Sequence, residues 1–198
     1  MRLTPDMKYP VFFLLLLLSG CEKLTTSPPV EQLPHVAQGS YAAALSDDAS
    51  YSAVSSIQDG VALWDLQNNA LKYQWKHHDN AENLVFSLAI SHNNSHVLTA
   101  DQNTYALWDI VSGKNVGFWQ IDAATVRDVA VSDNGAHLLI GKSDGGVQHI
   151  TLASGRRLEF LGHTERINSV AMSPNGRYAL TGGNDYKAHL WDTQSAQI

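Results

Sequence analysis

Residues 162–192, GHTERINSVAMSPNGRYALTGGNDYKAHLWD, decide the fold of this chain. An apolar run, VAMS (170–173), leads into the turn PNG (174–176), and a second apolar run and a polar gap lead to HLWD (189–192). Asn-Gly is a strong hairpin signal, because both residues accept a positive φ. The stretch therefore predicts short strands joined by tight turns.

The same pattern occurs four times along the chain. Aligned on a serine, the four copies begin AALS (43–46), LAIS (88–91), VAVS (129–132) and VAMS (170–173). The serines are 45, 41 and 41 residues apart, and a turn follows each of them. Such a period is typical of a protein built from repeated structural units.

Each copy continues to a characteristic pair and a second turn. The pairs are Trp64-Asp65, Trp108-Asp109 and Trp191-Asp192, and the third copy has Ile150 in the Trp place. Asn69, Gly113 and Gly155 stand five residues past the Trp place and suit a left-handed turn. Another short apolar run then completes four strands in about 41 residues.

These residues resemble the WD-repeat family of β-propellers, and the resemblance covers about residues 38–198. It implies an all-β fold of four-stranded antiparallel blades, at about 38–77, 78–121, 122–161 and 162–198. Propellers close with about four to eight blades, and WD-repeat examples usually have seven. Four repeats therefore predict an incomplete propeller. Three explanations are open: the sequence is a fragment of a longer protein, copies of the chain assemble, or the four blades form an open arc.

The resemblance also assigns a buried hydrogen-bonded tetrad to the fourth unit. Its members are His163, Thr181, Asp185 and Trp191, with the histidine bridging the carboxylate and the hydroxyl. The same residue types occur in hydrolase triads, but here the hydroxyl is expected inside the blade, away from any substrate. We therefore predict a structural role, no catalytic residue and no enzyme activity.

The other units depart from this tetrad. The second unit keeps Thr99 and Trp108 but has Asn103 in the Asp place, and His77-His78 lie out of register. The third has Ile140 and Ile150, and the first keeps Trp64 but has Val54 in the Thr place. These blades are expected to rely on apolar packing.

Function is expected in the loops, because propellers present variable loops on rigid blades. Aromatic and Arg side chains carry most interface energy, which makes Arg127, Arg166 and Tyr186 the candidate partner-docking residues. No metal site is predicted: His92 and His96 have metal-ligand spacing but flank a predicted hairpin turn. No cofactor is expected either.

The first twenty residues have the features of a secretory signal. Arg2 and Lys8 precede the apolar run VFFLLLLL (11–18), which is too short to span a bilayer. Residues 18–21, LSGC, resemble the lipobox of bacterial lipoproteins, which implies cleavage before Cys21 and its acylation. Glu22 in place of Asp favours the outer membrane, facing the periplasm, and residues 21–37 are expected to form a flexible linker.

Composition narrows the possible functions further. The chain has 198 residues, 44% of them apolar, a net charge of -6 and one cysteine. The absence of any basic block argues against nucleic-acid binding. The leading hypothesis is a lipid-anchored scaffold for protein partners in the bacterial envelope. The alternatives are an enzyme or ligand binder with its site in the central funnel, and a truncated product.

Overall fold

The computed structural model describes residues 39–79, 83–122 and 124–195. All of them belong to one of the two units into which the chain divides, residues 34–198. The described residues form fifteen strands and no helix. The predicted signal peptide, Cys21, the linker and the last residues of the fourth repeat (196–198) lie outside this part of the chain.

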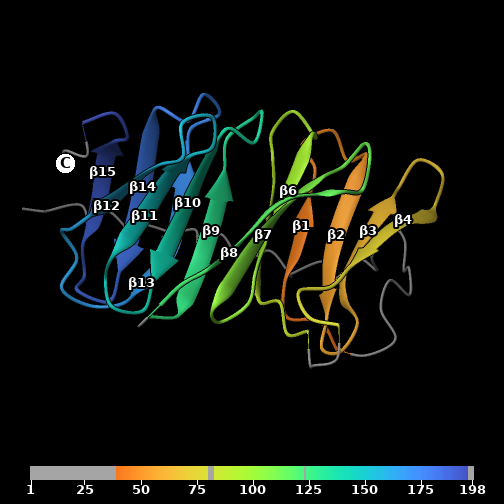
Figure 1. Cartoon of the computed structure of the whole chain (residues 1–198), viewed down its shortest axis with the longest axis horizontal. Coiled ribbons are helices and arrows are strands. Elements are labelled where there is room, and N and C mark those ends of the chain that lie inside the picture. Colours follow the sequence, from red (N-terminus) through yellow and green to blue (C-terminus); the bar gives the residue numbers. More distant parts are fainter. Residues whose placement is uncertain (1–38, 80–82, 123, 196–198) are drawn as a thin grey trace, which may run out of the picture. The chain divides into compact units, whose positions relative to one another are not determined.

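The strands form four antiparallel sheets that follow one another in sequence order (Figure 1). The first sheet contains β1 (Ala43–Leu45), β2 (Tyr51–Ser56), β3 (Gly60–Asp65) and β4 (Ala70–Trp75). The second contains β5 (Ser87–Ile90), β6 (His96–Ala100), β7 (Thr104–Asp109) and β8 (Asn115–Gln120).

The third sheet contains β9 (Val126–Val131), β10 (His137–Lys142), β11 (Val147–Thr151) and β12 (Arg156–Phe160). The fourth contains β13 (Ile167–Met172), β14 (Tyr178–Gly183) and β15 (Ala188–Asp192), which are its three strands among the described residues. The prediction of an all-β chain of antiparallel blades is confirmed, and the arrangement is consistent with an incomplete propeller.

The repeated serine organises the turn after the first strand of each sheet. Ser173 Oγ accepts a hydrogen bond from the backbone N–H of Tyr178 at 2.9 Å and donates one to Asn175 Oδ1 at 2.8 Å. Ser46 makes the equivalent pair of bonds with Tyr51 and Asp48. A short hydroxyl side chain thus satisfies a backbone donor within a tight turn.

The predicted left-handed turn positions are confirmed. Asn69, Gly113 and Gly155 have φ values of 47°, 71° and 66°. Asn and Gly are the residues that tolerate this backbone region at least cost. These turns therefore keep a constant spacing of five residues from the Trp place in the first three repeats.

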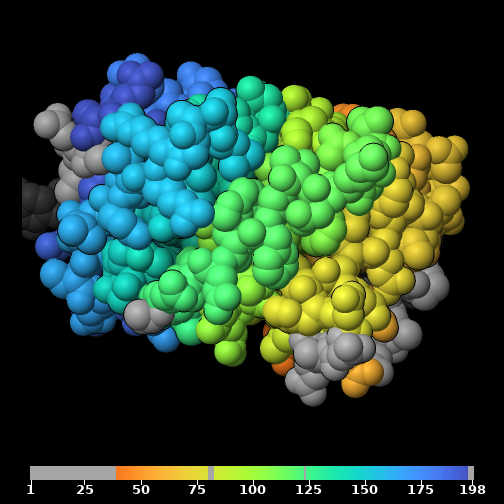
Figure 2. Space-filling view, in the orientation of Figure 1, coloured from red at the N-terminus to blue at the C-terminus, as the bar shows by residue number. Residues whose placement is uncertain are grey.

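Three apolar cores lie between successive sheets. Leu63 and Trp75 of the first sheet pack against Trp108 of the second. The next core joins the second and third sheets, and Trp191 of the fourth sheet packs with Phe160 of the third. Because strand side chains alternate between faces, each inner sheet contributes to two cores. Figure 2 shows the sheets in contact from the first (orange and yellow) through the second (green) to the fourth (blue).

Candidate interaction face

The fourth sheet holds a chain of four hydrogen-bonded side chains. His163 Nδ1 lies 2.9 Å from Asp185 Oδ1, and its Nε2 lies 2.8 Å from Thr181 Oγ1. Trp191 Nε1 donates to the same hydroxyl at 2.9 Å. The structure thus brings together the four residues that the WD-repeat resemblance assigns to the tetrad. Thr181 is only 1% exposed, so its hydroxyl is out of reach of a substrate.

The second sheet contains a similar network, which the sequence analysis missed. His77 Nε2 lies 2.7 Å from Thr99 Oγ1, to which Trp108 Nε1 also donates at 2.9 Å. His77 Nδ1 lies 2.8 Å from Thr104 Oγ1 and 3.4 Å from Asp101 Oδ2. His77 is out of sequence register, as predicted, but it still occupies the histidine place of the network, and Asp101 supplies the carboxylate that we expected at position 103.

Both carboxylates are held in the ionised form. Burial alone would raise the pKa of Asp101, but hydrogen bonds from His77 and Thr104 hold that pKa well below its usual range. Burial is likewise outweighed at Asp185, where hydrogen bonds from His163 and two backbone N–H groups lower the pKa to about 2. A carboxylate that is ionised at neutral pH orients the adjacent imidazole and does not act as a general acid.

Among the described residues, the third sheet has Ile140 and Ile150 in the threonine and tryptophan places, and the first sheet has Val54 in the threonine place. Ile140 and Ile150 are buried in the core between the second and third sheets. Val54 pairs with Ala62, and Ser52 pairs with Trp64. Apolar contacts replace the hydrogen bonds in the third sheet, as the sequence predicts.

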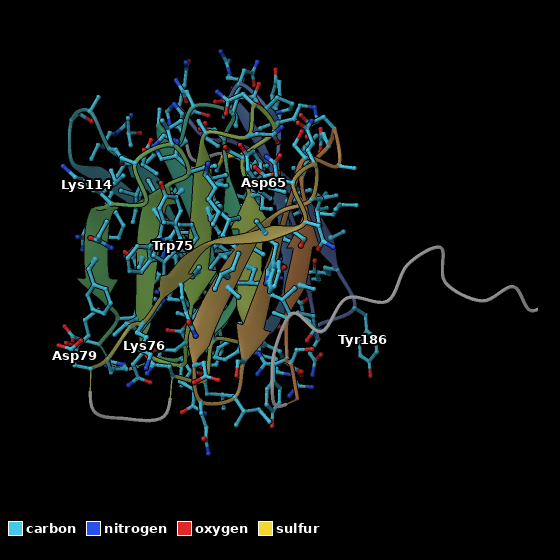
Figure 3. All side chains as sticks on the ribbon, turned by 90° about the vertical axis from the view of Figure 1, so that its right-hand side faces the viewer. Asp65, Trp75, Lys76, Asp79, Lys114 and Tyr186 are labelled. Carbon is cyan, nitrogen blue, oxygen red and sulfur yellow. The ribbon has the colours of Figure 1, made fainter. Side chains whose placement is uncertain are left out.

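The loops that join successive sheets lie at one end of the strands. Figure 3 shows Asp79 and Tyr186 at this end, and Asp65 and Lys114 at the opposite end. We call the end that carries Asp79 and Tyr186 the loop face. Tyr186 is fully exposed and has a φ of 63°, in the loop between β14 and β15.

The three predicted docking residues are not equally placed on this face. Arg166 is exposed, and its carbonyl oxygen accepts a hydrogen bond from Asn184 N at 3.0 Å, which ties its loop to the loop of Tyr186. Arg127 is exposed on β9, one residue after Val126, whose N–H donates to Gln102 O at 2.8 Å. Arg166 and Tyr186 therefore lie on neighbouring loops, whereas Arg127 lies beside the β6–β7 loop of the second sheet.

A cleft of about 490 Å³ opens beside the second network. Phe118, 45% exposed, and Gln120 come from strand β8, and sequence reasoning overlooked both because it searched only the loops. His78 Nε2 lies 2.9 Å from Asp101 Oδ2 at the same cleft. Its lining among the described residues is His78, Leu84, Asp101, Gln102, Asn103, Thr104, Phe118 and Gln120. An aromatic ring among amides and an ionised carboxylate suits a polypeptide with mixed polar and apolar side chains.

The histidines with metal-ligand spacing point to different partners. His96 Nδ1 lies 2.7 Å from Ser95 Oγ, while His92 Nδ1 contacts the carboxylate of Asp47. In the described part of the chain, no helix is long and apolar enough to cross a membrane.

Comparison with known proteins adds two kinds of match. Residues 69–109 and 155–192 match the sequence model of the family "WD domain, G-beta repeat". The chain is 27% identical over 172 residues to "Cell division cycle 20.5, cofactor of APC complex" of Arabidopsis thaliana, a match that covers 85% of this chain and 38% of that protein.

Two further relatives carry the repeat in their names. "WD repeat-containing protein SL1-17" of Schistosoma mansoni is 24% identical over 148 residues, covering 74% of this chain and 48% of that protein. An uncharacterized WD repeat-containing protein of Synechocystis sp. is 31% identical over 104 residues, covering 52% of this chain and 29% of that protein. The chain thus spans less than half the length of each of these relatives.

Proposed function

We propose that this chain, which carries WD40 repeats, is a scaffold that binds protein partners through its loop face. The observation that carries the proposal is the exposure of Tyr186 and Arg166 on neighbouring loops of a tightly hydrogen-bonded sheet. A rigid frame presents such side chains with little loss of conformational entropy on binding. In this proposal the chain binds its partner and catalyses no reaction on it.

Two regions of the loop face contribute to docking in this proposal. Tyr186 and Arg166 form one region, and the cleft with Phe118 and Asp101 forms the other. Tyr and Arg side chains dominate measured interface energies. A partner that spans both regions would bring an apolar side chain to Phe118 and a basic or hydrogen-bond donor group to Asp101.

A cross-linking pull-down with the full chain tests this proposal. We expect a stoichiometric protein partner with the wild type and a large loss of it with the triple variant Arg127→Ala, Arg166→Ala and Tyr186→Ala. The matched control is Lys114→Ala, at the opposite end of the strands in Figure 3, which should retain the partner. Equal recovery of the partner by the triple variant and the control would refute the proposed docking residues.

We also propose that Cys21 is acylated and holds the scaffold on a bacterial envelope membrane, in the outer membrane facing the periplasm. The support is the sequence LSGC (18–21) after a basic start and an apolar run. Several acyl chains on one N-terminus give stable membrane binding, at about 0.8 kcal/mol per buried CH₂. Metabolic labelling with a fatty acid should mark the wild type and fail to mark Cys21→Ser.

A further inference from the structure

Three side chains that can bind a metal ion meet at the loop end of the fourth sheet. They are His163, Asp185 and His189, and one donor atom from each lies within 4.8 Å of the other two. The rings of His163 and His189 are in edge contact, with centroids 4.4 Å apart. The first two residues belong to the tetrad, whereas His189 takes no part in it.

His189 has a buried nitrogen without a partner. Its Nε2 is inaccessible to solvent and has no hydrogen bond among the described residues. Both nitrogens of the adjacent His163 are already engaged, one by Asp185 and the other by Thr181. Buried polar groups are normally satisfied, so the unpaired nitrogen of His189 is a ligand atom available to a metal ion beside a carboxylate and another imidazole.

The backbone leaves room beside the other two donors. A Cβ atom at Gly183 would lie 2.7 Å from His163 Nδ1 and 3.0 Å from Asp185 Oδ1. Thr181 and His189 are register partners, and Gly183 lies two residues from Thr181, so all three share one face of the sheet. A glycine at this position therefore keeps that side of the donor pair free of any side chain.

The second sheet provides an internal comparison. It has the same histidine, carboxylate, threonine and tryptophan network, but Ala106 is the register partner of its threonine, Thr99. In the third sheet the equivalent position is Gln148, opposite Ile140. The tetrad therefore does not require a histidine at position 189, and the third donor is a feature of the fourth sheet.

We propose that His163 Nδ1, an Asp185 oxygen and His189 Nε2 bind a divalent transition-metal ion of the zinc class. Two imidazoles and a carboxylate are ligands that Zn²⁺ prefers over the all-oxygen sets of Ca²⁺ and Mg²⁺. His163 Nδ1 and Asp185 Oδ1 are 2.9 Å apart, near the separation of about 3.3 Å between two tetrahedral ligands with bonds of about 2.0 Å. The His189 donor lies within 4.8 Å of the other two, and the proposed site closes by a rotation of the His189 ring.

Metal binding changes the hydrogen bonding of His163 in a defined way. Nδ1 faces the carboxylate and donates its proton to it, so Nε2 accepts the hydroxyl hydrogen of Thr181. A metal ion on Nδ1 leaves the ring neutral when the proton moves to Nε2. The Thr181 hydroxyl then turns its own hydrogen away from the ring, and Oγ1 accepts from both His163 Nε2 and Trp191 Nε1. The tetrad then keeps its contact with Thr181, and the metal ion replaces the histidine–aspartate hydrogen bond. The proposed metal site does not depend on the docking function proposed above.

Zinc titration of the full chain, purified without a histidine tag, tests the site. We expect one Zn²⁺ per chain by calorimetry and a rise in melting temperature with added Zn²⁺. His189→Ala, which copies Ala106 of the second sheet, should weaken the affinity by at least about tenfold. The control His92→Ala removes an exposed histidine elsewhere and should leave the affinity unchanged.

His189→Gln, which copies Gln148, replaces the alanine variant if that chain fails to fold. Circular dichroism in the absence of metal establishes that each variant keeps its β structure. No Zn²⁺ binding by the wild type at about 100 µM, the concentration that half fills a site with a Kd of about 100 µM, would overturn the proposal. Equal affinity in the wild type and the folded His189 variants would overturn it as well.

Discussion

Asp128 Oδ2 accepts a hydrogen bond from the backbone N–H of Val170 at 2.8 Å, which links β9 to β13 across two sheets. The other oxygen of Asp128 accepts a hydrogen bond from Ser87 Oγ at 2.9 Å. Ser87 Oγ in turn accepts from Val129 N at 3.1 Å. One side chain thus connects the inner strands of three successive sheets, in addition to the apolar cores between them.

Replacement of Asp128 with alanine should weaken these connections. The variant leaves a backbone donor and a hydroxyl without their acceptor, so we expect a loss of about 2–4 kcal/mol in the free energy of unfolding. Urea denaturation followed by tryptophan fluorescence measures it. The control Asp144→Ala removes a carboxylate that is half exposed and accepts from Gly146 N within its own turn. A similar loss in both variants would contradict the bridging role.

The two tetrads should respond alike to loss of their central hydroxyl. Thr99→Val and Thr181→Val keep the side-chain volume but leave a tryptophan N–H and a histidine nitrogen unpaired. We expect each substitution to destabilise the fold by about 1–3 kcal/mol. The control Ile140→Val changes the same position in the third sheet, which has no such network, and should cost about 0.5–1.5 kcal/mol by the loss of one methylene. If the threonine variants unfold at the same urea concentration as the wild type, the networks are not structural.

The sequence predicts the strands and turns of this fold well, because each depends on local chemistry. The serine at the end of the first strand and the Asn or Gly at each turn act within five residues of themselves. Their spacing is therefore conserved from one repeat of the chain to the next. The tetrad of the second sheet depends instead on residues that are far apart in sequence.

Loop length explains why that second tetrad was missed. His163 precedes Thr181 by 18 residues, whereas His77 precedes Thr99 by 22. The four extra residues lie in the connection between β4 and β5, so an alignment by number displaces the histidine. Asp101 also lies two residues before the expected position 103. Thr104 contacts both residues: its Oγ1 lies beside His77 Nδ1, and its backbone N–H donates to Asp101. The second tetrad is therefore recognised from the contacts in the structure and not from a fixed spacing in the sequence.

Two glycines with similar backbone angles should tolerate a side chain very differently. Gly113 has a φ of 71°, and a Cβ atom there would overlap the ring of Tyr73 in the first sheet. Gly155 has a φ of 66°, and a Cβ atom there meets nothing within 4 Å. We expect Gly155→Ala to cost about 1–2 kcal/mol for the left-handed backbone alone. Gly113→Ala should cost at least about 1 kcal/mol more, because the contact between sheets must shift.

Thermal melts of the two glycine variants measure the difference. Tyr73 also donates its hydroxyl hydrogen to Val111 O at 2.8 Å, two residues before Gly113. A Gly113→Ala, Tyr73→Ala double variant should therefore be less destabilised than the sum of its single variants. Simple additivity of the two substitutions would argue against the predicted overlap.

A buried histidine, His149, packed on the partly buried His137, should make the stability of the fold depend on pH. His137 Nδ1 lies 3.2 Å from His149 Nε2, and His149 Nδ1 is buried with no hydrogen bond among the described residues. Burial, together with the nearby His137 and Arg156, lowers the pKa of His149 to about 4. The ordinary value is 6.5, so the unfolded chain binds a proton at this residue at a higher pH than the folded chain does.

Above about pH 6.5 His149 is neutral in both the folded and the unfolded chain and does not reduce the free energy of unfolding. As the pH falls from 6.5 toward 4, protonation of the unfolded chain lowers that free energy. His149→Leu removes this effect and copies Leu190, the residue at the matching register position of the fourth sheet. Urea midpoints measured from pH 7.5 to pH 4.5 should fall less steeply in this variant than in the wild type, while His92→Ala should follow the wild type. Because His149 packs against Phe160 between the third and fourth sheets, an unchanged slope would mean that acid opens the fold at another pair of sheets.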